Sequence, residues 1–267
     1  MSAQPIVPES DPLLLWHQEG GILRLTLNRP LQYNALSAEM LAALQAALRR
    51  IANDASVRVL VLGGAGKAFC AGHDLRQVGE QNRLEDLQRL FADCSRVMAQ
   101  IRELPQPVIA RVQGVATAGG CQLVASCDLA VAAAEARFAV SGINIGLFCS
   151  TPAVPLSRNI GQKQAFEMLI TGEFIDAETA RERGLVNRVV PAAELDAQID
   201  RLAAAILAKP ARILAAGKAL FYRQQEMGIA AAYQLAVQAM ACNVLEADAQ
   251  EGIAAFLDKR APVWRAG

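Results

Sequence analysis

A chain of 267 residues, of which 53% are apolar and 19% charged, holds enough apolar material for one large folded domain with surface left for self-association. Its 26 Lys and Arg residues balance 26 Asp and Glu residues, and without a basic tract we expect no nucleic-acid partner. Its apolar runs are short and interrupted by polar residues, so we expect no membrane span.

The six cysteines are scattered along the chain, without a C-x-x-C pair or a cluster of histidines beside them. This spacing argues against a zinc site and against a disulfide framework, so we expect no bound metal. Free cysteines and the lack of an apolar signal segment among the first residues favour a reducing compartment. We therefore expect a cytoplasmic protein.

Along the first hundred residues, short strand patterns alternate with amphipathic helix patterns. Residues 1–12 contain three prolines among polar neighbours, which predicts a flexible leader. Alternating apolar residues around a glycine turn predict a hairpin over 13–27, and Ser37 is the candidate N-cap of the helix that follows. The stretch 57–62, apolar except for Arg58, predicts a buried strand, and one apolar stripe predicts a helix over 84–103.

The middle of the chain then repeats this plan. A second buried strand is predicted over 108–112, followed by a small-residue loop over 114–120, a helix over 121–127 and a strand over 129–133. Strand, glycine loop, helix and strand in this order predict an α/β fold with two glycine loops in equivalent places.

The C-terminal part beyond residue 200 carries no strand pattern. Four alanine-rich segments with a helical period follow one another: 196–208, 211–226, 228–247 and 249–259. We expect a core over 13–200 and a helical C-terminal region over 201–267. Because this region is too small for a large core of its own, we expect it to pack on its own body or on a neighbouring subunit, as an oligomerisation region.

Three common catalytic signatures are missing from the sequence. Gly66-Lys67 lacks the other residues of a P-loop, and no G-x-G-x-x-G follows a predicted strand. No G-x-S-x-G is present, and the only histidines are His17 and His73, so a serine-hydrolase triad is not supported.

Two loops, 68–75 and 116–123, place small residues where a predicted strand ends and a helix begins. At such a point backbone N–H groups lack partners and face outward with the positive end of the helix dipole. Two of them converging on one point would form an oxyanion hole for a thioester enolate. Alternatively, the glycines only permit tight turns, and the residues by themselves leave both interpretations open.

The motifs of these loops, together with others in order, resemble the crotonase superfamily of enoyl-CoA hydratases and isomerases. The matching stretches are A-G-H-D at 71–74, A-G-G-C at 118–121, and further motifs at 28–30, 34–36, 127–130, 180–190 and 256–260. The resemblance extends from about residue 13 to residue 264, and within the superfamily it is strongest to the branch of enoyl-CoA hydratase domain-containing proteins.

This resemblance carries expectations about fold, assembly and ligand. It implies an α/β fold in which ββα units form a crotonase-like spiral, with the C-terminal helices as a trimerisation region. It implies a homotrimer or a hexamer. It also implies a coenzyme A thioester as substrate or ligand, in fatty-acid or acyl-CoA metabolism, and no further cofactor.

For the site, the resemblance implies that the backbone amides of His73 and Gly119 form the oxyanion hole. It also implies that Lys259 and Arg260 meet the CoA phosphates of the same or a neighbouring subunit. The substrate-binding residues carried over from the same motifs are Ala35, Leu36, Ala71, Gly72, Asp74, Leu75, Gly120 and Cys149. We further expect Asp74 to cap the helix after its loop.

Two positions depart from the hydratase pattern. Hydration needs one carboxylate to activate water and a second to exchange a proton with the α-carbon. The resemblance places these two groups at Gln122 and Gly142. An amide takes up no proton near neutral pH and glycine has no side chain, so we expect an enzyme of this superfamily that hydrates slowly at best.

Three interpretations of the altered site remain open. The A-G-H-D loop is similar to that of methylmalonyl-CoA decarboxylases, in which loss of carbon dioxide generates the enolate without a base. A carboxylate elsewhere could substitute for the missing pair; the candidates are Glu80, Glu85, Asp86 and Glu167, although we expect each on a solvated surface. Finally, the protein could bind acyl-CoA without turnover.

Two kinds of reactive side chain lie in or near these motifs. For His73 we expect only the backbone amide to matter, with the side chain facing solvent. Cys121 and Cys149 are expected near the cavity, but without a histidine assigned beside them a cysteine nucleophile is not favoured.

Overall fold

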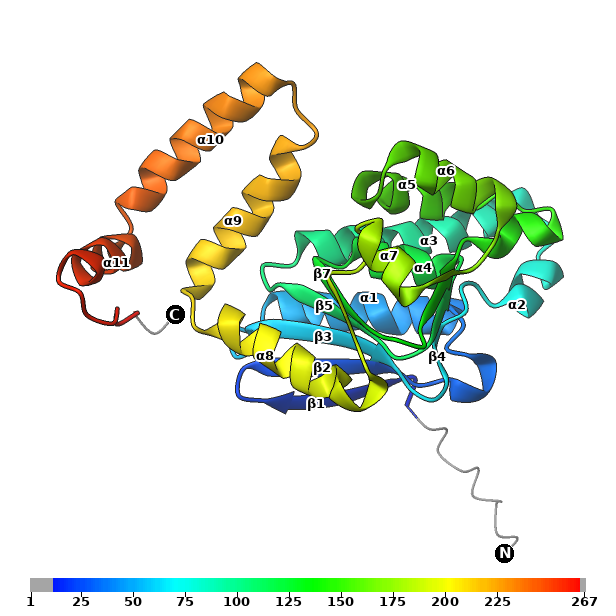
Figure 1. The fold of residues 1–267 in the computed structure, drawn as a ribbon. Helices are drawn as coiled ribbons and strands as arrows, with labels where there is room; N and C mark the ends of the chain where they lie inside the picture. The colour runs from blue at the N-terminus through cyan, green and yellow to red at the C-terminus, as the bar shows by residue number, and fades with distance from the viewer. Residues whose placement is uncertain (1–11, 265–267) are drawn as a thin grey trace, which may run out of the picture.

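The computed structural model describes residues 12–264, and within them ten strands form two sheets (Figure 1). The larger sheet has the strand order β1 (Leu14–Glu19), β2 (Ile22–Leu27), β3 (Val59–Gly64), β5 (Val108–Val112), β7 (Leu129–Ala133) and β10 (Arg188–Val190). The smaller sheet has the order β4 (Ala68–Cys70), β6 (Val115–Thr117), β8 (Arg137–Ala139) and β9 (Ile175–Asp176). In these two sheets the pairs β1–β2 and β8–β9 are antiparallel and the others are parallel.

Helices surround the sheets and extend beyond them. In chain order they are α1 (Ala38–Ala52), α2 (Leu75–Glu80), α3 (Leu84–Glu103), α4 (Gly119–Ser126), α5 (Ser150–Asn159), α6 (Gln162–Thr171), α7 (Ala177–Glu182), α8 (Leu195–Leu207), α9 (Ala211–Gln224), α10 (Ile229–Val244) and α11 (Ala247–Leu257). Short 3₁₀ helices are η1 (Pro30–Gln32), η2 (Ser141–Ile145) and η3 (Ala192–Glu194).

Three strand pairs repeat one plan, which is the ββα pattern expected from the resemblance. β3–β4, β5–β6 and β7–β8 each place the first strand in the larger sheet and the second in the smaller, with a helix after the pair. Gly114 and Gly120 flank β6, and a Cβ atom at either would overlap the backbone oxygen of Lys67 or Cys70 beside β4. Glycine is required here because successive units approach each other backbone to backbone.

The core lies on both faces of the larger sheet because successive residues of a strand point to opposite faces. On one face Leu60 and Leu62 of β3 pack with the buried sides of α1 and α3. On the other face Val59 and Val61 pack under α8. The four positions 59–62 of β3 are therefore all apolar, in agreement with the buried strand predicted there.

The elements predicted from local patterns are largely present, but the strands β4 and β6 of the smaller sheet lie in stretches that were expected as loops. The helix predicted over 84–103 is α3, and Ser37 caps α1, its hydroxyl oxygen accepting a hydrogen bond from the Met40 amide at 3.2 Å. The hairpin is β1–β2. The helix predicted over 121–127 begins earlier, at Gly119, because its first turn consists of glycines, whose low helix propensity conceals the start.

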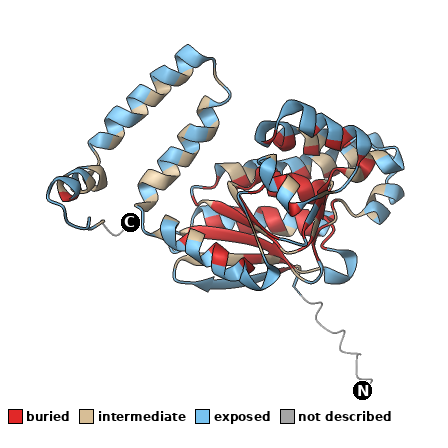
Figure 2. Cartoon of the chain, viewed as in Figure 1, coloured by how far each residue is buried: buried red, intermediate tan, exposed pale blue. Residues whose placement is uncertain are grey.

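The C-terminal helices α9, α10 and α11 leave the body as an arm, which lies to one side in Figure 1. Within the described chain, α9 and α10 bury no residue, and the arm is mostly exposed in Figure 2. By contrast, α8 packs on the sheet through Leu195, Ile199 and Ala203. The boundary expected between residues 200 and 201 therefore falls inside α8, and the arm begins with α9.

A buried polar network joins the arm to the body. The Lys218 ammonium on α9 lies 2.6 Å from the Asp128 carboxylate and donates to the backbone oxygens of Ile101 and Gln106 at 2.9 and 3.0 Å. The Tyr222 hydroxyl, one turn further along α9, donates to the other Asp128 oxygen at 2.7 Å. These contacts hold the first helix of the arm against the end of α3 and the start of β7.

Between residues 12 and 264 no helix has the length and apolarity needed to cross a membrane, and no three His, Cys, Asp or Glu side chains gather as a possible metal site. The flexible leader expected over 1–12 lies, apart from its last residue, outside the described range.

Candidate active site

The two glycine loops singled out in the sequence meet in the structure. Gly72 has a φ of +90°, and a Cβ atom there would lie 2.9 Å from the Ala118 Cβ and 3.0 Å from the Gly119 nitrogen. Leu36 runs parallel to this loop: its amide donates to the Gly72 oxygen at 2.8 Å, and its oxygen accepts from the Asp74 amide at 3.3 Å. Glycine at position 72 thus permits both the left-handed backbone and the close contact between the loops.

Two backbone amides at this junction have no partner. The N–H groups of His73 and Gly119 donate to no residue that the structure describes. Gly119 is the first residue of α4, where an N–H has no partner within the helix. Both residues line one cavity, so two free donors are available to a ligand in it.

Ala118, immediately before α4, has an unusual backbone with φ +49° and ψ −118°. Its amide donates to the Ala139 oxygen at 3.0 Å, which anchors the turn on β8. A residue with a Cβ atom in such a conformation costs on the order of 1–3 kcal/mol. The strain is located at the turn that orients the Gly119 amide.

Replacing Ala118 by glycine is therefore expected to raise the free energy of unfolding by about 1 kcal/mol. This is the net of two effects: the strain of the folded backbone is relieved, and the larger conformational entropy of glycine stabilises the unfolded chain. Urea denaturation measures this difference. The matched control is Ala116→Gly, two residues earlier in β6, where the residue is buried and has no positive φ, so the same change is expected to destabilise. Destabilisation by both changes would contradict the assignment of strain.

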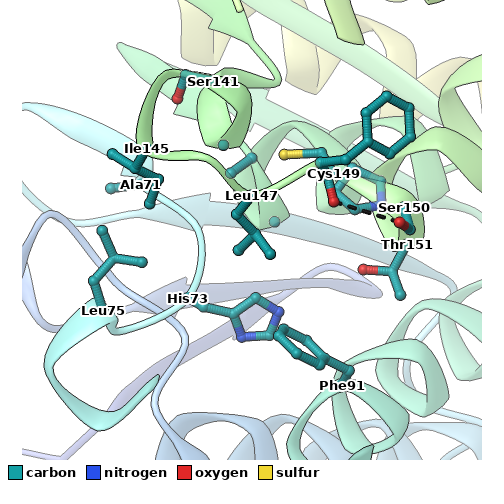
Figure 3. Close-up of a pocket in the computed structure, with 15 residues that line it drawn as sticks. Ala71, His73, Leu75, Phe91, Ser141, Ile145, Leu147, Cys149, Ser150 and Thr151 are labelled. Carbon is teal, nitrogen blue, oxygen red and sulfur yellow. Dashed lines mark hydrogen bonds between the residues drawn. The ribbon is translucent and has the colours of Figure 1, made fainter. Parts of the chain in front are cut away.

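The cavity between the loops has a volume of about 290 Å³ (Figure 3). Its lining consists of Ala71, His73, Leu75, Phe91, Ala118, Gly119, Ser141, Gly142, Ile145, Leu147, Phe148, Cys149, Ser150, Thr151 and Pro152. Among these described residues none carries a permanent charge, and the titratable groups are His73 and Cys149. The cavity is thus largely apolar, with a few uncharged polar groups on its wall.

The His73 side chain lies in this cavity, so the expectation that it faces solvent is wrong. Its ring makes an edge-to-face contact with Phe91 of α3, with ring centres 5.1 Å apart and planes at 88° (Figure 3). Both ring nitrogens are buried, and neither has a hydrogen-bond partner among the described residues. Burial lowers the pKa of His73 below its usual value of 6.5, and the Leu36 backbone, too poorly aligned for a hydrogen bond, offsets this only in part, so the imidazole is neutral at pH 7.

Gln122, at the position expected for the first hydratase glutamate, lies on α4, whose eight residues are all buried. Its side-chain oxygen is 3.5 Å from the Thr151 hydroxyl, which donates to it, and 3.9 Å from the Cys94 thiol. Thr151 belongs to the cavity wall whereas Gln122 does not. The amide therefore acts in a neutral hydrogen-bond network behind the wall and offers no acid or base.

Gly142, at the second position of the pair, is closed to any side chain. A Cβ atom there would lie 2.5 Å from the Leu147 oxygen and 2.7 Å from the Cys149 sulfur. The Leu147 amide donates to the Gly142 oxygen at 3.0 Å, which holds the segment in place. The following segment thus fills the space in which a glutamate would begin, and glycine is a packing requirement here.

The other expected binding residues divide into two groups. Ala71, Leu75 and Cys149 line the cavity, whereas Ala35, Leu36, Gly72, Asp74 and Gly120 do not. Asp74 caps α2 as expected, accepting from the Arg76 amide at 3.2 Å, and forms an ion pair with Arg29 at 3.1 Å. Its contacts are therefore structural.

Lys259 and Arg260 follow α11, which lies across the molecule from α2 in Figure 1. Neither lines the cavity of its own chain. Arg260 forms an ion pair with Glu251 at 2.6 Å on the same arm. Contact with a ligand in this cavity would therefore require a neighbouring subunit.

The candidate substitutes for the missing carboxylates also lie elsewhere. None of the four described carboxylates proposed from sequence lines the cavity: Glu80, Glu85, Asp86 and Glu167. The cysteines are not activated either. Burial raises the pKa of Cys121 to about 12 and also raises the pKa of Cys149, so both are thiols at neutral pH.

Two wall residues were missed as functional candidates by the sequence analysis. Phe91 belongs to the apolar stripe of α3 and is indistinguishable there from a core residue, and Thr151 lies in the first turn of α5, a helix that was not predicted. The one local signal was the stretch 141–152, which carries no strand or helix prediction and supplies nine of the fifteen wall residues.

The fold and the site together define an α/β protein with the crotonase fold. A family model described as enoyl-CoA hydratase/isomerase matches residues 17–267. Enoyl-CoA hydratase domain-containing protein 3, mitochondrial, of Rattus norvegicus is 45% identical over 265 residues, 98% of this chain and 88% of the relative. The chain belongs to the enoyl-CoA hydratase/isomerase family.

Solved structures agree with this assignment. The crystal structure of an enoyl-CoA hydratase of Mycobacterium smegmatis is similar with a TM-score of 0.94 at 57% identity, covering 96% of this chain and 100% of that one. That of human enoyl-CoA hydratase domain-containing protein 3 gives a TM-score of 0.92 at 44% identity, covering 95% and 100%. The resemblance stated from motifs is thereby confirmed.

The expected cytoplasmic location is wrong on this comparison. Relatives from rat, mouse, Xenopus laevis and human, 44% to 45% identical to this chain, are named as mitochondrial proteins. The scattered cysteines argued for a reducing compartment, and this argument does not distinguish one such compartment from another.

Proposed function

We propose that this chain binds an acyl-CoA with its thioester oxygen at the amides of His73 and Gly119, and stabilises the enolate formed there. The observation that carries the proposal is the contact between two glycine loops, which leaves two unpartnered amides on one cavity. Donors held in advance at the position where negative charge develops stabilise it strongly in a water-poor site. Membership of the enoyl-CoA hydratase/isomerase family supports a CoA thioester as the ligand.

The residues of the cavity wall favour an acyl group of a particular charge. Leu75, Phe91 and Leu147 offer apolar contacts, and within the described wall no cation is available to a carboxylate. An acyl group without charge therefore fits this cavity better than a malonyl or methylmalonyl group.

Efficient hydration of an enoyl-CoA is not part of this proposal. Gln122 supplies a neutral amide behind the wall, and Gly142 leaves no room for a side chain. Loss of one general acid–base group typically lowers a rate by ~10²–10⁴-fold.

Mass spectrometry of a mixed acyl-CoA panel incubated with the purified protein tests the proposal. The panel contains short and long enoyl, 3-hydroxyacyl, malonyl and methylmalonyl esters. A changed ester identifies the reaction: a water adduct would contradict the argument from Gln122 and Gly142, and loss of carbon dioxide would indicate a decarboxylase. Retained but unchanged esters indicate a binding protein without turnover, and failure to retain any ester would overturn the proposal.

We also propose that the helical region over 201–267 mediates self-association of cores formed by 13–200, as a homotrimer or hexamer. An exposed apolar stripe on α10 supports this: Ile229, Tyr233, Val237, Met240 and Val244 are 79%, 70%, 67%, 71% and 42% exposed. Their spacing places them on one face of the helix. A contiguous apolar face of this kind on a folded chain is typical of a protein interface.

The double variant Val237→Glu with Met240→Lys is expected to convert the oligomer to single chains, because it places two charges in the apolar stripe. The opposite charges three residues apart preserve both the helix and the net charge. Sedimentation velocity compares the mass of the variant with that of the wild type. Ala204→Glu with Ala205→Lys on the exposed side of α8 is the control, and an unchanged mass of the α10 variant would exclude this helix as the interface.

Assembly through the arm would bring its end to another subunit. Lys259 and Arg260 would then be available to the phosphates of a CoA bound by the neighbouring subunit. They do not line the cavity of their own chain.

A further inference from the structure

The cavity wall contains one group that is able to accept a proton at neutral pH. The hydroxyls of Ser141, Ser150 and Thr151 are not bases, and the raised pKa of Cys149 keeps it a thiol. The remaining polar side chain is the His73 imidazole, whose two nitrogens are buried and unpartnered among the described residues. A buried polar group without a hydrogen-bond partner costs free energy. A ligand in this cavity would supply the missing partner of the imidazole.

Covalent geometry keeps this ring close to the amide proposed to hold the thioester oxygen. His73 supplies one of the two free amides from its backbone, and its side chain lies in the same cavity. A thioester oxygen accepting from that amide lies about 3 Å from the nitrogen, and the α-carbon is two bonds from the oxygen. The ring of the same residue is thus within reach of a proton on the α-carbon.

We infer that the His73 imidazole is the proton-transfer group of this site, acting on the α-carbon of an acyl-CoA whose acyl group is uncharged. The inference rests on the proposed binding of the thioester at the two amides. The unprotonated ring nitrogen takes the α-proton, the electron pair of the C–H bond forms the C=C bond of the enolate, and the carbonyl pair moves to the oxygen held by the two N–H groups. The reverse step returns a proton from the imidazolium to carbon.

The surroundings of the ring fit a neutral base. Phe91 of α3 covers one side, and the titratable group that shares the cavity wall is the neutral thiol of Cys149. Asp74, the next residue in the chain, is paired with Arg29 at 3.1 Å. Behind the wall, the pKa values of the Cys70 and Cys94 thiols are both raised to about 12, so no charge arises there at neutral pH.

Exchange of α-hydrogen for deuterium tests this inference without knowledge of the final product. The wild-type protein is incubated with butyryl-CoA in D₂O, and mass spectrometry follows the gain of one and then two mass units. His73→Gln keeps both the backbone amide and a polar side chain but takes up no proton, so we expect ~10²–10⁴-fold slower exchange with butyryl-CoA still bound. His17→Gln, at the other histidine of the chain, is exposed on β1 and is expected to exchange as the wild type does.

Two readouts separate proton transfer from a structural role. Exchange by the wild type is expected to be constant above pH 6.5 and to fall only at lower pH, because the ring is protonated below its lowered pKa. Added imidazole is expected to restore part of the exchange in His73→Ala. Butyryl-CoA bound without exchange by the wild type, or exchange by His73→Gln within fivefold of wild type, would overturn the inference while leaving the binding proposal intact. Failure of the wild type to bind butyryl-CoA would overturn both.

Discussion

Replacing Lys218 by methionine is expected to lower the free energy of unfolding by about 3–5 kcal/mol, the cost typical of removing one partner from a buried ion pair. The side chains of Lys218 and Asp128 are only 7% and 14% exposed, and the ammonium lies 2.6 Å from the carboxylate. Without it, the Asp128 charge stays buried, and two backbone oxygens also lose their donor. Methionine preserves the length and apolar stem of the side chain, so the loss reflects the charge and its hydrogen bonds.

Urea denaturation of the assembled protein measures this effect. Lys209→Met, at an exposed position beyond α8, is the matched control and is expected to change stability by less than about 0.5 kcal/mol. A triple variant in which Asp128→Leu and Tyr222→Phe accompany Lys218→Met is expected to regain part of the loss, because it removes the buried charge and hydroxyl while the Val108 amide and two backbone oxygens stay unpaired. A cost below about 1 kcal/mol for Lys218→Met would show that the network contributes little to stability.

Replacing Gly119 by proline is expected to reduce any turnover by ~10²-fold or more, since it removes one of the two donors to the developing oxyanion. Proline is compatible with the first position of a helix, where its missing N–H interrupts no helical bond. Its Cβ atom would lie 3.3 Å from the Gly72 Cα and from the Leu36 side chain, and its ring would meet Ala118, whose ψ of −118° is outside the range favoured before proline, so the turn must also shift.

Gly119→Ala is the matched control because it introduces the same Cβ contact and keeps the N–H. Turnover, or α-hydrogen exchange, is compared among the three proteins together with their thermal unfolding. Equal losses in the proline and alanine variants would assign the effect to packing. Full activity of the proline variant would show that the Gly119 amide is not part of the site.

Much of the secondary structure followed from local pattern. The apolar stripe of α3 and the hydroxyl cap of α1 identify helices because side chains three or four residues apart share one helix face, and because a serine oxygen satisfies a free amide. The start of α4 was misplaced because Gly119 and Gly120 have low helix propensity.

For the candidate site, sequence analysis found the two loops but not how their side chains lie. His73 was expected in solvent, whereas Phe91 and the cavity wall enclose it. Gly142 was interpreted as a missing glutamate, whereas Leu147 and Cys149 occupy the space of any side chain there. Both outcomes depend on contacts between segments that no local pattern connects.

The sequence by itself determined the family and many of the strands and helices, and it supplied the prediction that Gln122 and Gly142 stand where a hydratase would carry its glutamates. These are properties of motifs and of hydrophobic periodicity, which are read along the chain. The tertiary structure alone decided that His73 faces the cavity, that Gly142 is closed, and that Lys218 binds Asp128. Each of these contacts joins residues from different elements, and it exists because the two sheets and the arm bring those elements together.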